Sequence, residues 1–256
     1  MRALNGWLLA VYGFLYLPIA VLMVLSFNRS GMPTAWGGFS LEWYGKLAEN
    51  PKILSAAWNS LVVAVWATAI STVLGTLLAL GVERARPSTS REALLFAPMI
   101  IPDIVLAIAL LSFFTLIKFS LGLRSIVMAH VVFNLAFVCA VVRARLKSYD
   151  WSLNEASRDL GATATVTFFR ITLPLIGPSV LAGALLAFTL SIDEFIIAYF
   201  TAGAGQSSTT LPMQIYAMIR FGVTPEINAM ATVVMGVSFV IILAAQRLNK
   251  GRLPGT

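Results

Sequence analysis

The sequence predicts an all-α polytopic membrane protein with six transmembrane helices. Hydrophobic residues make up 59% of the 256-residue chain and charged residues only 11%, with a mean hydropathy of +0.86. Soluble domains carry about 25% charged residues, so this composition excludes an ordinary soluble protein. Six windows approach the roughly 20 apolar residues that cross a bilayer as a helix. They are residues 7–27, 58–82, 93–117, 125–142, 179–200 and 228–245.

The first window is expected to be a retained spanning helix. A cleaved signal peptide is the alternative, but the apolar run is longer than the usual 7 to 15 residues and no small-x-small cleavage site follows it. The segments between the windows are too short for an independent core. We therefore expect one transmembrane domain over residues 1–256, with a cytosolic loop at about 150–175.

Lysine and arginine favour a cytosolic position for both termini. Of the 18 basic residues, 12 fall in the segments that are inside if the N-terminus is cytosolic, and six fall in the outer segments. Positively charged loops resist translocation. The net charge of +7 is then explained by anchoring at the inner leaflet, and no nucleic-acid partner is expected.

The longest inner loop, "SYDWSLNEASRDLGATATVTFFRITLPLIGPS", is expected to form two helices. Ser152 and Glu155 have the spacing of a capping box, which predicts a helix from Leu153. Gly161 can take the left-handed conformation that ends it. The result is a short helix of about two turns.

A second helix is expected over residues 163–172. Pro174 should stop it, because proline has no amide hydrogen. Three of its apolar side chains are expected to be buried near the membrane surface, namely Val166, Phe169 and Ile171. The residues alone leave two interpretations open, an ordinary folded connector or a rigid contact for a partner.

Two adjacent acids, Asp193 and Glu194, interrupt the fifth window in "LSIDEFIIAY". They lie roughly 20 Å from its cytosolic end if the window is one continuous helix. An unpaired carboxylate there is costly, so it is a functional candidate by default. Glu194 shares a helical stripe with small or polar residues suited to a helix contact or an aqueous path: Gly183, Ala187, Ser191, Ala198 and Thr201. We favour Glu194 as facing a substrate path and Asp193 as its flank, with a packing role as the alternative.

A third acid, Asp103, follows Pro98 and Pro102 near the middle of the third window. Prolines free backbone carbonyls, which is tolerated where the helix lines a cavity or packs on protein. Three acids along one path would attract a flexible polycation. Tyr199 and Phe200 could add cation–π contacts to an amine.

Several other polar and aromatic residues receive structural interpretations. His130 and Asn134, four residues apart, are expected to form interhelical hydrogen bonds rather than a metal site. Cys139 is expected to be packed in the core, and as the only cysteine it cannot form an intrachain disulfide. Three aromatics near span ends are expected to be interfacial anchors: Trp58, Tyr149 and Trp151. The outer segment 201–227 is expected to contain a short helix.

The cytosolic loop resembles the EAA motif of permease subunits of bacterial ABC importers. The match consists of Glu155-Ala156-Ser157, three residues, Gly161, nine residues, and I-x-L-P at 171–174, with serine in place of alanine at the third position. The resemblance implies a coupling helix seated in a cleft of a separate ATP-hydrolysing subunit. The residues it assigns to this contact are Glu155, Ala156, Ser157, Gly161, Ala162, Ile171 and Pro174. The chain has no G-x-x-x-x-G-K-[ST] motif, so ATP would be bound by the partner, and we expect neither a cofactor nor catalysis in this chain.

Further segments resemble the second permease subunit of polyamine (spermidine/putrescine) importers over most of the chain. They are "FSLEWYGKL", "PMIIPDIVLAIALL", "LSIDEFIIAYFTAG" and "TTLPMQIYAMIRFGVTPEINAMAT". The resemblance implies a type I ABC importer permease fold and alternating access in the bacterial inner membrane. The implied partners are a dimer of cytosolic ATP-binding subunits, a second permease and an extracytoplasmic polyamine-binding protein. A permease for another solute, or a secondary transporter or channel that uses the intramembrane acids, remains the alternative.

Overall fold

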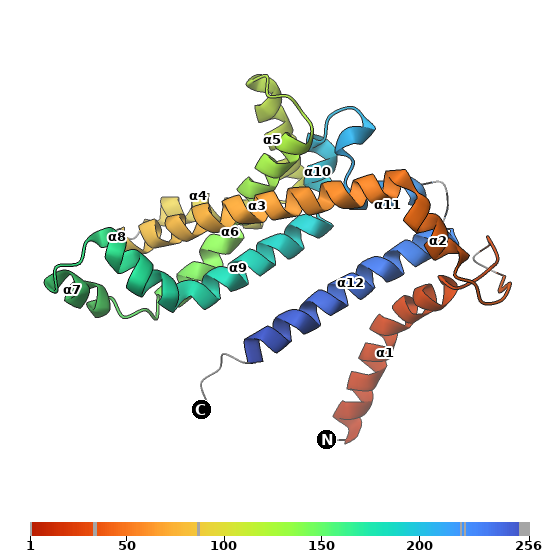
Figure 1. Cartoon of the computed structure of the whole chain (residues 1–256), viewed down its shortest axis with the longest axis horizontal. Helices are drawn as coiled ribbons and strands as arrows, with labels where there is room; N and C mark the ends of the chain where they lie inside the picture. The colour runs from red at the N-terminus through yellow and green to blue at the C-terminus, as the bar shows by residue number, and fades with distance from the viewer. Residues whose placement is uncertain (1, 33–34, 86–87, 221, 223, 251–256) are drawn as a thin grey trace. The chain divides into compact units, whose positions relative to one another are not determined.

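The computed structural model describes residues 2–32, 35–85, 88–220, 222 and 224–250, without the side chains of residues 2–5, 206, 238 and 240–250. Throughout these residues the regular structure is helical, with one isolated bridge between Asn28 and Phe39 (Figure 1). Arg86 and Arg252, which contributed to the predicted orientation, lie outside the described residues. The elements are α1 (Arg2–Leu25), α2 (Glu42–Glu49), α3 (Pro51–Arg84), α4 (Thr89–Ile100), α5 (Asp103–Leu116), α6 (Leu123–Leu146), α7 (Ser152–Asp159), α8 (Ala164–Thr167), the π-helical turn η1 (Phe168–Thr172), α9 (Leu173–Asp193), α10 (Ile196–Thr201), η2 (Gln206–Ser208), α11 (Leu211–Ile219) and α12 (Pro225–Lys250).

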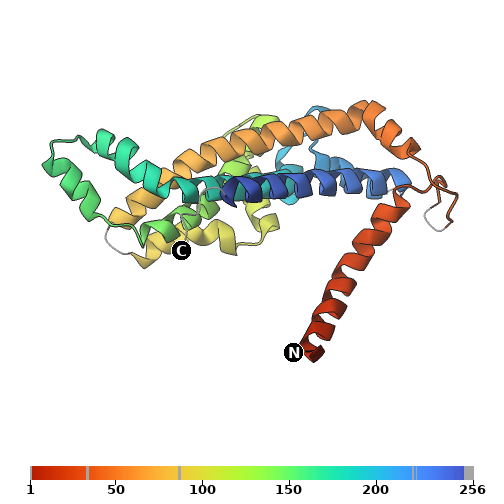
Figure 2. The same cartoon turned by 60° about the horizontal axis from the view of Figure 1, so that its bottom comes forward.

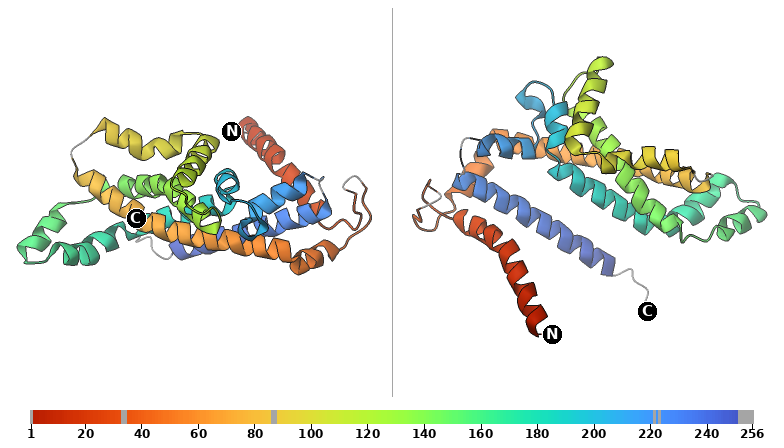
Figure 3. Two further views of the ribbon diagram at one scale, coloured as in Figure 1. Left: turned by 90° about the horizontal axis from the view of Figure 1, so that it is seen from above. Right: turned by 180° about the vertical axis from the view of Figure 1, so that it is seen from behind.

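Four stretches of the described chain are long and apolar enough to cross a membrane. They are Gly6–Leu25, Pro51–Arg84, Leu123–Leu146 and Ala164–Asp193. A fifth crossing is possible if α4 and α5 count as one span, although they are bent by 105° (Figure 3). The sixth predicted window lies in α12, and the structure does not describe most side chains in the second half of this helix. The structure therefore supports four or five of the six predicted spans.

Contacts divide the chain into two compact units. The first contains residues 1–54 and 214–256, and within it α12 packs against α1 and α2 (Figure 2). The loop between α1 and α2 holds its shape without a disulfide, because the Trp43 indole donates to the Asn28 carbonyl oxygen at 2.7 Å and the rings of Phe27 and Phe39 stack at 5.2 Å.

The second unit, residues 55–213, is built around α6. This helix contacts α4, α5, α9 and α10. Gly75 lets α3 approach closely, since a Cβ there would lie 2.8 Å from Cβ of Val138. Cys139 is fully buried in the same core cluster, which confirms its predicted packing role.

The small-residue stripe of the fifth window is a buried helix contact. All five of its members are buried: Gly183, Ala187, Ser191, Ala198 and Thr201. Four of them are at most 3% exposed. A Cβ on Gly183 would lie 3.4 Å from Cγ1 of Val138, so the stripe brings α9 against α6. The stripe was predicted to form either a helix contact or an aqueous path, and in this chain it forms a helix contact.

Two predictions about helix continuity are wrong. The fifth window is not one helix, because α9 ends at Asp193 and Glu194 is extended (φ −71°, ψ 122°) before α10 begins. Conversely, Pro174 does not stop a helix, since α8, η1 and α9 form a continuous helical run. The π-helical turn explains this: Leu173 donates to the carbonyl oxygen of Phe168, and the wider turn accommodates the proline that follows.

Candidate functional site

The first candidate site is the segment from Tyr149 to Pro174, which we call the coupling segment. It lies at one end of the second unit (Figure 1). Its first helix does not use the predicted capping box. Trp151 is the N-cap residue and makes no side-chain cap bond, which places Ser152 inside the first turn. The Asp150 carboxylate instead accepts a hydrogen bond from the Ser152 amide at 3.0 Å. Hydrogen bonds from Ser152 lower the pKa of Asp150 below its ordinary value.

Gly161 ends α7 as predicted. Its φ of +83° lies in the left-handed region that favours glycine. The amides of Gly161 and Ala162 donate to the carbonyl oxygens of Arg158 and Ser157 at 2.8 and 3.1 Å. These bonds satisfy the last carbonyls of the helix and turn the chain back. Thr163 then caps α8 by accepting from the Val166 amide at 3.4 Å.

The second helix of the coupling segment faces inward through threonines. Val166 and Phe169, which were expected to be buried, are 41% and 60% exposed in this chain. Thr167 and Thr172 are buried instead, at 3% and 1%. The expectation failed because the threonines, which hydrogen-bond to Ser157 and Asn154 of α7, form the face of this helix that meets α7. Ile171 is partly buried.

Side-chain hydrogen bonds join the two arms of the coupling segment. Ser157 Oγ lies 3.0 Å from Thr167 Oγ1, and Asn154 Nδ2 donates to Thr172 Oγ1 at 3.2 Å. Asn154 Oδ1 also accepts from the Tyr149 hydroxyl at 2.6 Å. Ser157, the one departure from the motif, thus makes a bond that alanine could not make.

The predicted interfacial anchors differ in their exposure. Tyr149 is 7% exposed, so the prediction of an interfacial anchor is wrong there, since its hydroxyl is used inside the segment. Trp151 packs edge-on against the Tyr149 ring at 4.9 Å and is half-buried. Trp58 is 65% exposed, as an interfacial anchor requires.

The tip of the coupling segment is exposed and free for a partner. Leu160, next to the turn, is 90% exposed, and Leu153 is 42% exposed. Glu155, Ala156 and Gly161 are exposed as well. A folded arm that presents small and apolar residues at its end can enter a groove closely, and large exposed apolar residues are typical of an interaction site.

An ion-pair group at the same end of this unit was not predicted. Arg143 of α6 contacts Glu83 of α3 at 3.1 Å and Glu92 of α4 at 2.6 Å. The exposed fraction of the side chain is 16% for Arg143, 20% for Glu83 and 44% for Glu92. One guanidinium therefore links three helix ends. Sequence reasoning counted Arg143 only as a loop charge, because nothing in the pattern paired it with acids 60 and 51 residues away.

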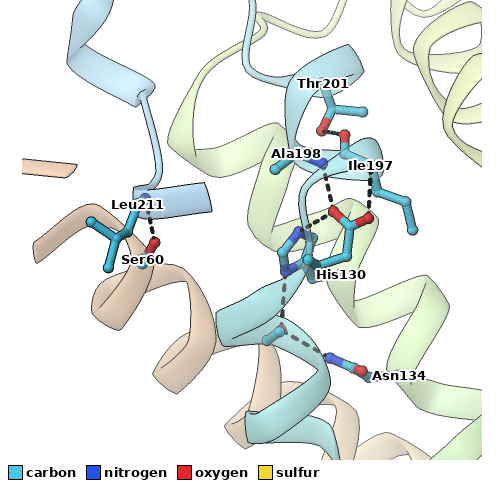
Figure 4. Close-up of polar contacts among 9 residues, drawn as sticks. Ser60, His130, Asn134, Ile197, Ala198, Thr201 and Leu211 are labelled. Atoms are coloured by element: carbon cyan, nitrogen blue, oxygen red, sulfur yellow. Dashed lines mark hydrogen bonds and ion pairs between the residues drawn. The ribbon is translucent and has the colours of Figure 1, made fainter. Parts of the chain in front are cut away.

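The second candidate site is the break between α9 and α10 (Figure 4). Glu194 accepts hydrogen bonds from the amides of Ile197 and Ala198, both at 2.8 Å, and so caps α10. Its Oε2 also lies 3.5 Å from His130 Nε2, with the two side chains 7% and 1% exposed. The carboxylate is thus held by backbone donors at the N-terminus of a helix, where negative charge is favourable.

His130 and Asn134 form the predicted interhelical hydrogen bonds. Both reach the Ser191 hydroxyl of α9, from His130 Nδ1 and Asn134 Nδ2, each at 3.0 Å (Figure 4). All three residues are at most 3% exposed. Within the described part of the chain, no group of three or more His, Cys, Asp or Glu side chains is placed to hold a metal ion.

The other two acids also lie at helix ends. Asp193 is the last residue of α9 and is exposed. Asp103 is the first residue of α5, directly after the bend at Pro102, and is exposed as well. Pro102, one of the two prolines expected to free backbone carbonyls, lies at this bend, and the start of α5 is turned out of the chain's own core.

The aromatics after the acidic pair form a small ring cluster. Tyr199 is 50% exposed, and its ring lies 5.4 Å from Phe195 and 5.9 Å from Phe200. Phe200 is partly buried against the core formed by α5, α6 and α10. Tyr199 therefore presents an exposed aromatic surface on α10, and Phe200 packs edge-on against it.

Sequence comparison decides the family. The pattern of the family described as "Binding-protein-dependent transport system inner membrane component" matches residues 71–253. The chain belongs to this family. It is a transport component of the inner membrane, and the resemblance read from the coupling segment is confirmed.

Individual members of the family are similar along almost the whole chain. The spermidine/putrescine transport system permease protein PotC of Escherichia coli K12 is 40% identical over 255 residues, covering 98% of this chain and 95% of PotC. The putrescine transport system permease protein PotI of the same strain is 39% identical over 259 residues, covering 96% and 92%. PotC of Haemophilus influenzae is 36% identical over 248 residues, covering 96% of each chain.

Chains of solved bacterial ABC transporters share the fold. A chain of a bacterial ABC transporter that imports alginate superposes with a TM-score of 0.78 at 17% identity, covering 99% of this chain and 96% of that one. A chain of the MetNI methionine ABC transporter gives a TM-score of 0.65 at 18% identity, covering 79% and 96%. The ABC importer permease architecture of this inner membrane component is thereby established.

Proposed function

We propose that this chain is a permease subunit of an ATP-driven importer that moves polyamines, spermidine or putrescine, across the bacterial inner membrane. The observation that carries the proposal is the 40% identity to PotC over 98% of the chain. In this proposal α12 supplies the sixth span, and both termini are cytosolic, as the distribution of basic residues favours.

Transport works by alternating access between this chain and a second permease. A dimer of cytosolic ATP-binding subunits drives the cycle, and an extracytoplasmic polyamine-binding protein delivers the substrate. The coupling segment transmits the motion, because its two arms are joined by the Ser157 and Asn154 hydrogen bonds and its tip is exposed. The seven residues assigned to the contact with the ATP-binding subunits are Glu155, Ala156, Ser157, Gly161, Ala162, Ile171 and Pro174. The chain itself needs no cofactor.

The acids at the helix breaks form the substrate path. Asp193 and Asp103 are exposed in this chain and can face a polycation, whereas Glu194 is held by backbone amides and shapes the break beside them. Tyr199 offers an aromatic face to an amine, and Phe200 supports it. Coulomb attraction between carboxylates and ammonium groups is strengthened where water is scarce.

Uptake of labelled spermidine and putrescine by proteoliposomes tests the proposal. The vesicles contain the assembled importer with ATP inside and binding protein outside. We expect ATP-dependent uptake that falls at least tenfold in Asp193→Asn and Asp103→Asn, while Arg145→Gln on the cytosolic side transports normally. Uptake driven by an ion gradient without ATP would instead indicate a secondary transporter. ATP-dependent uptake of another solute but no polyamine would keep the permease and discard the substrate.

A further inference from the structure

A cavity of about 400 Å³ lies between the end of α3 and the coupling segment. Two arginines line it, Arg84 from α3 and Arg158 from α7. Neither forms a salt bridge with an acidic side chain in the described part of the chain. Two arginines therefore line one cavity, and none of the described residues that line it with them is acidic.

The guanidinium of Arg84 is held in place by an aromatic ring. Its Cζ lies 5.0 Å from the centroid of the Trp151 ring, which is itself fixed by packing on Tyr149. Stacking on an aromatic face leaves the edge of a guanidinium available for planar, bidentate hydrogen bonds. Thr165 lines the same cavity, and its hydroxyl is a neutral donor. These groups are the donors that recognise the oxygens of a phosphate.

The cavity is polar near Arg84 and becomes more apolar toward the earlier turns of α3. Leu77 and Leu80 lie one to two turns before Arg84 on α3, and Phe168 lines the cavity from η1. In an inner-membrane protein, the end of a spanning helix lies at the level of the lipid headgroups. A ligand with an anionic head and an apolar body fits this gradient better than a soluble anion does.

We propose that this cavity binds the phosphate group of an anionic phospholipid in the cytosolic leaflet. Arg84 and Arg158 contact the phosphate, and the leucines contact the upper part of the acyl chains. Basic pockets on the cytosolic side of membrane proteins bind anionic headgroups in this way. The proposal rests on the proposed function only for the cytosolic orientation of the coupling segment. A bound lipid would fill the space behind the arm and stiffen it.

Native mass spectrometry of the purified importer complex tests this site. The complex is incubated with phosphatidylglycerol, or with phosphatidylcholine of the same acyl chains, and retained lipid is counted. We expect preferential retention of phosphatidylglycerol and a loss of roughly fivefold in affinity for each arginine removed in Arg84→Gln and Arg158→Gln. Arg145→Gln removes an exposed charge outside the cavity and should bind as wild type does.

Several results would overturn the proposal. Equal retention of the two lipids by the wild-type complex would overturn it. This result needs no variant, so it does not depend on whether the variants fold. Retention of phosphatidylglycerol by the double variant at the wild-type level would also exclude the cavity. Displacement of the lipid by inorganic phosphate would assign the cavity to a soluble anion. Retention of the lipid by the permease chains alone, but not by the complete complex, would assign the cavity to the ATP-binding subunits. None of these readouts depends on polyamine uptake, so the lipid site and the transported substrate fail separately.

Discussion

Replacing Glu194 by alanine should destabilise the second unit strongly. The substitution removes the acceptor for two amide donors, those of Ile197 and Ala198, which are both fully buried. A buried donor left without a partner costs about 1–3 kcal/mol, so two of them predict a loss of about 2–6 kcal/mol. Glu194→Gln keeps one acceptor oxygen and should lose about half of that. The His130 contact is lost or weakened in both variants.

The assay is reversible unfolding of the purified chain by titration of SDS in mixed micelles, monitored by circular dichroism. Asp193→Ala is the matched control, because it removes the neighbouring acid, which is exposed, and exposed substitutions usually change stability by no more than about 0.5 kcal/mol. A free energy of unfolding in Glu194→Ala equal to that of the wild type would refute the capping argument. So would an equal loss in the Asp193 variant.

Three further substitutions test other parts of the structure. Gly75→Ala places a Cβ 2.8 Å from Val138 and should lower stability by about 1–3 kcal/mol in the same titration; an unchanged midpoint would mean that α3 and α6 are not this close. Gly161→Leu should reduce the amount of polyamine taken up per ATP hydrolysed, because leucine does not tolerate the φ of +83° at this position. Gly161→Asn should couple uptake to hydrolysis nearly normally, because asparagine tolerates this conformation. Equal uptake per ATP in the two variants would contradict a role for the turn. Arg143→Gln frees two glutamates from three linked helix ends and should increase protease cleavage in the loop between α3 and α4; an unchanged cleavage rate would show that the ion pairs do not hold this end together.

Composition and spacing predicted the helices and several local features. Apolar windows located α1, α3 and α6, because a length of about 20 apolar residues is set by the bilayer and needs no tertiary information. Pro102 and Gly161 marked a bend and a helix end, since each acts through its own backbone geometry.

The arrangement of the candidate sites depended on contacts that sequence spacing does not reveal. The break at Glu194 has no proline or glycine to mark it. Local amides hold the carboxylate, and His130, which is 64 residues away in the sequence, lies beside it. Pro174 looked like a helix stop, but a π-helical turn absorbed it. The partners of Ser157 and Asn154 became apparent only when the two arms of the coupling segment were folded together.

Site-directed cross-linking between the coupling segment and an ATP-binding subunit tests the central claim most directly. Cys139 is the only cysteine and is buried, so it is replaced by serine to give a clean background. A cysteine at Leu160, which is 90% exposed, should then cross-link to the ATP-binding subunit of the assembled importer, and the cross-link should stop ATP-dependent polyamine uptake. A cysteine at Phe39, which is 70% exposed in the loop between α1 and α2, serves as the control and should not cross-link to that subunit. An importer that transports polyamine with ATP but shows no contact at Leu160 would contradict the account.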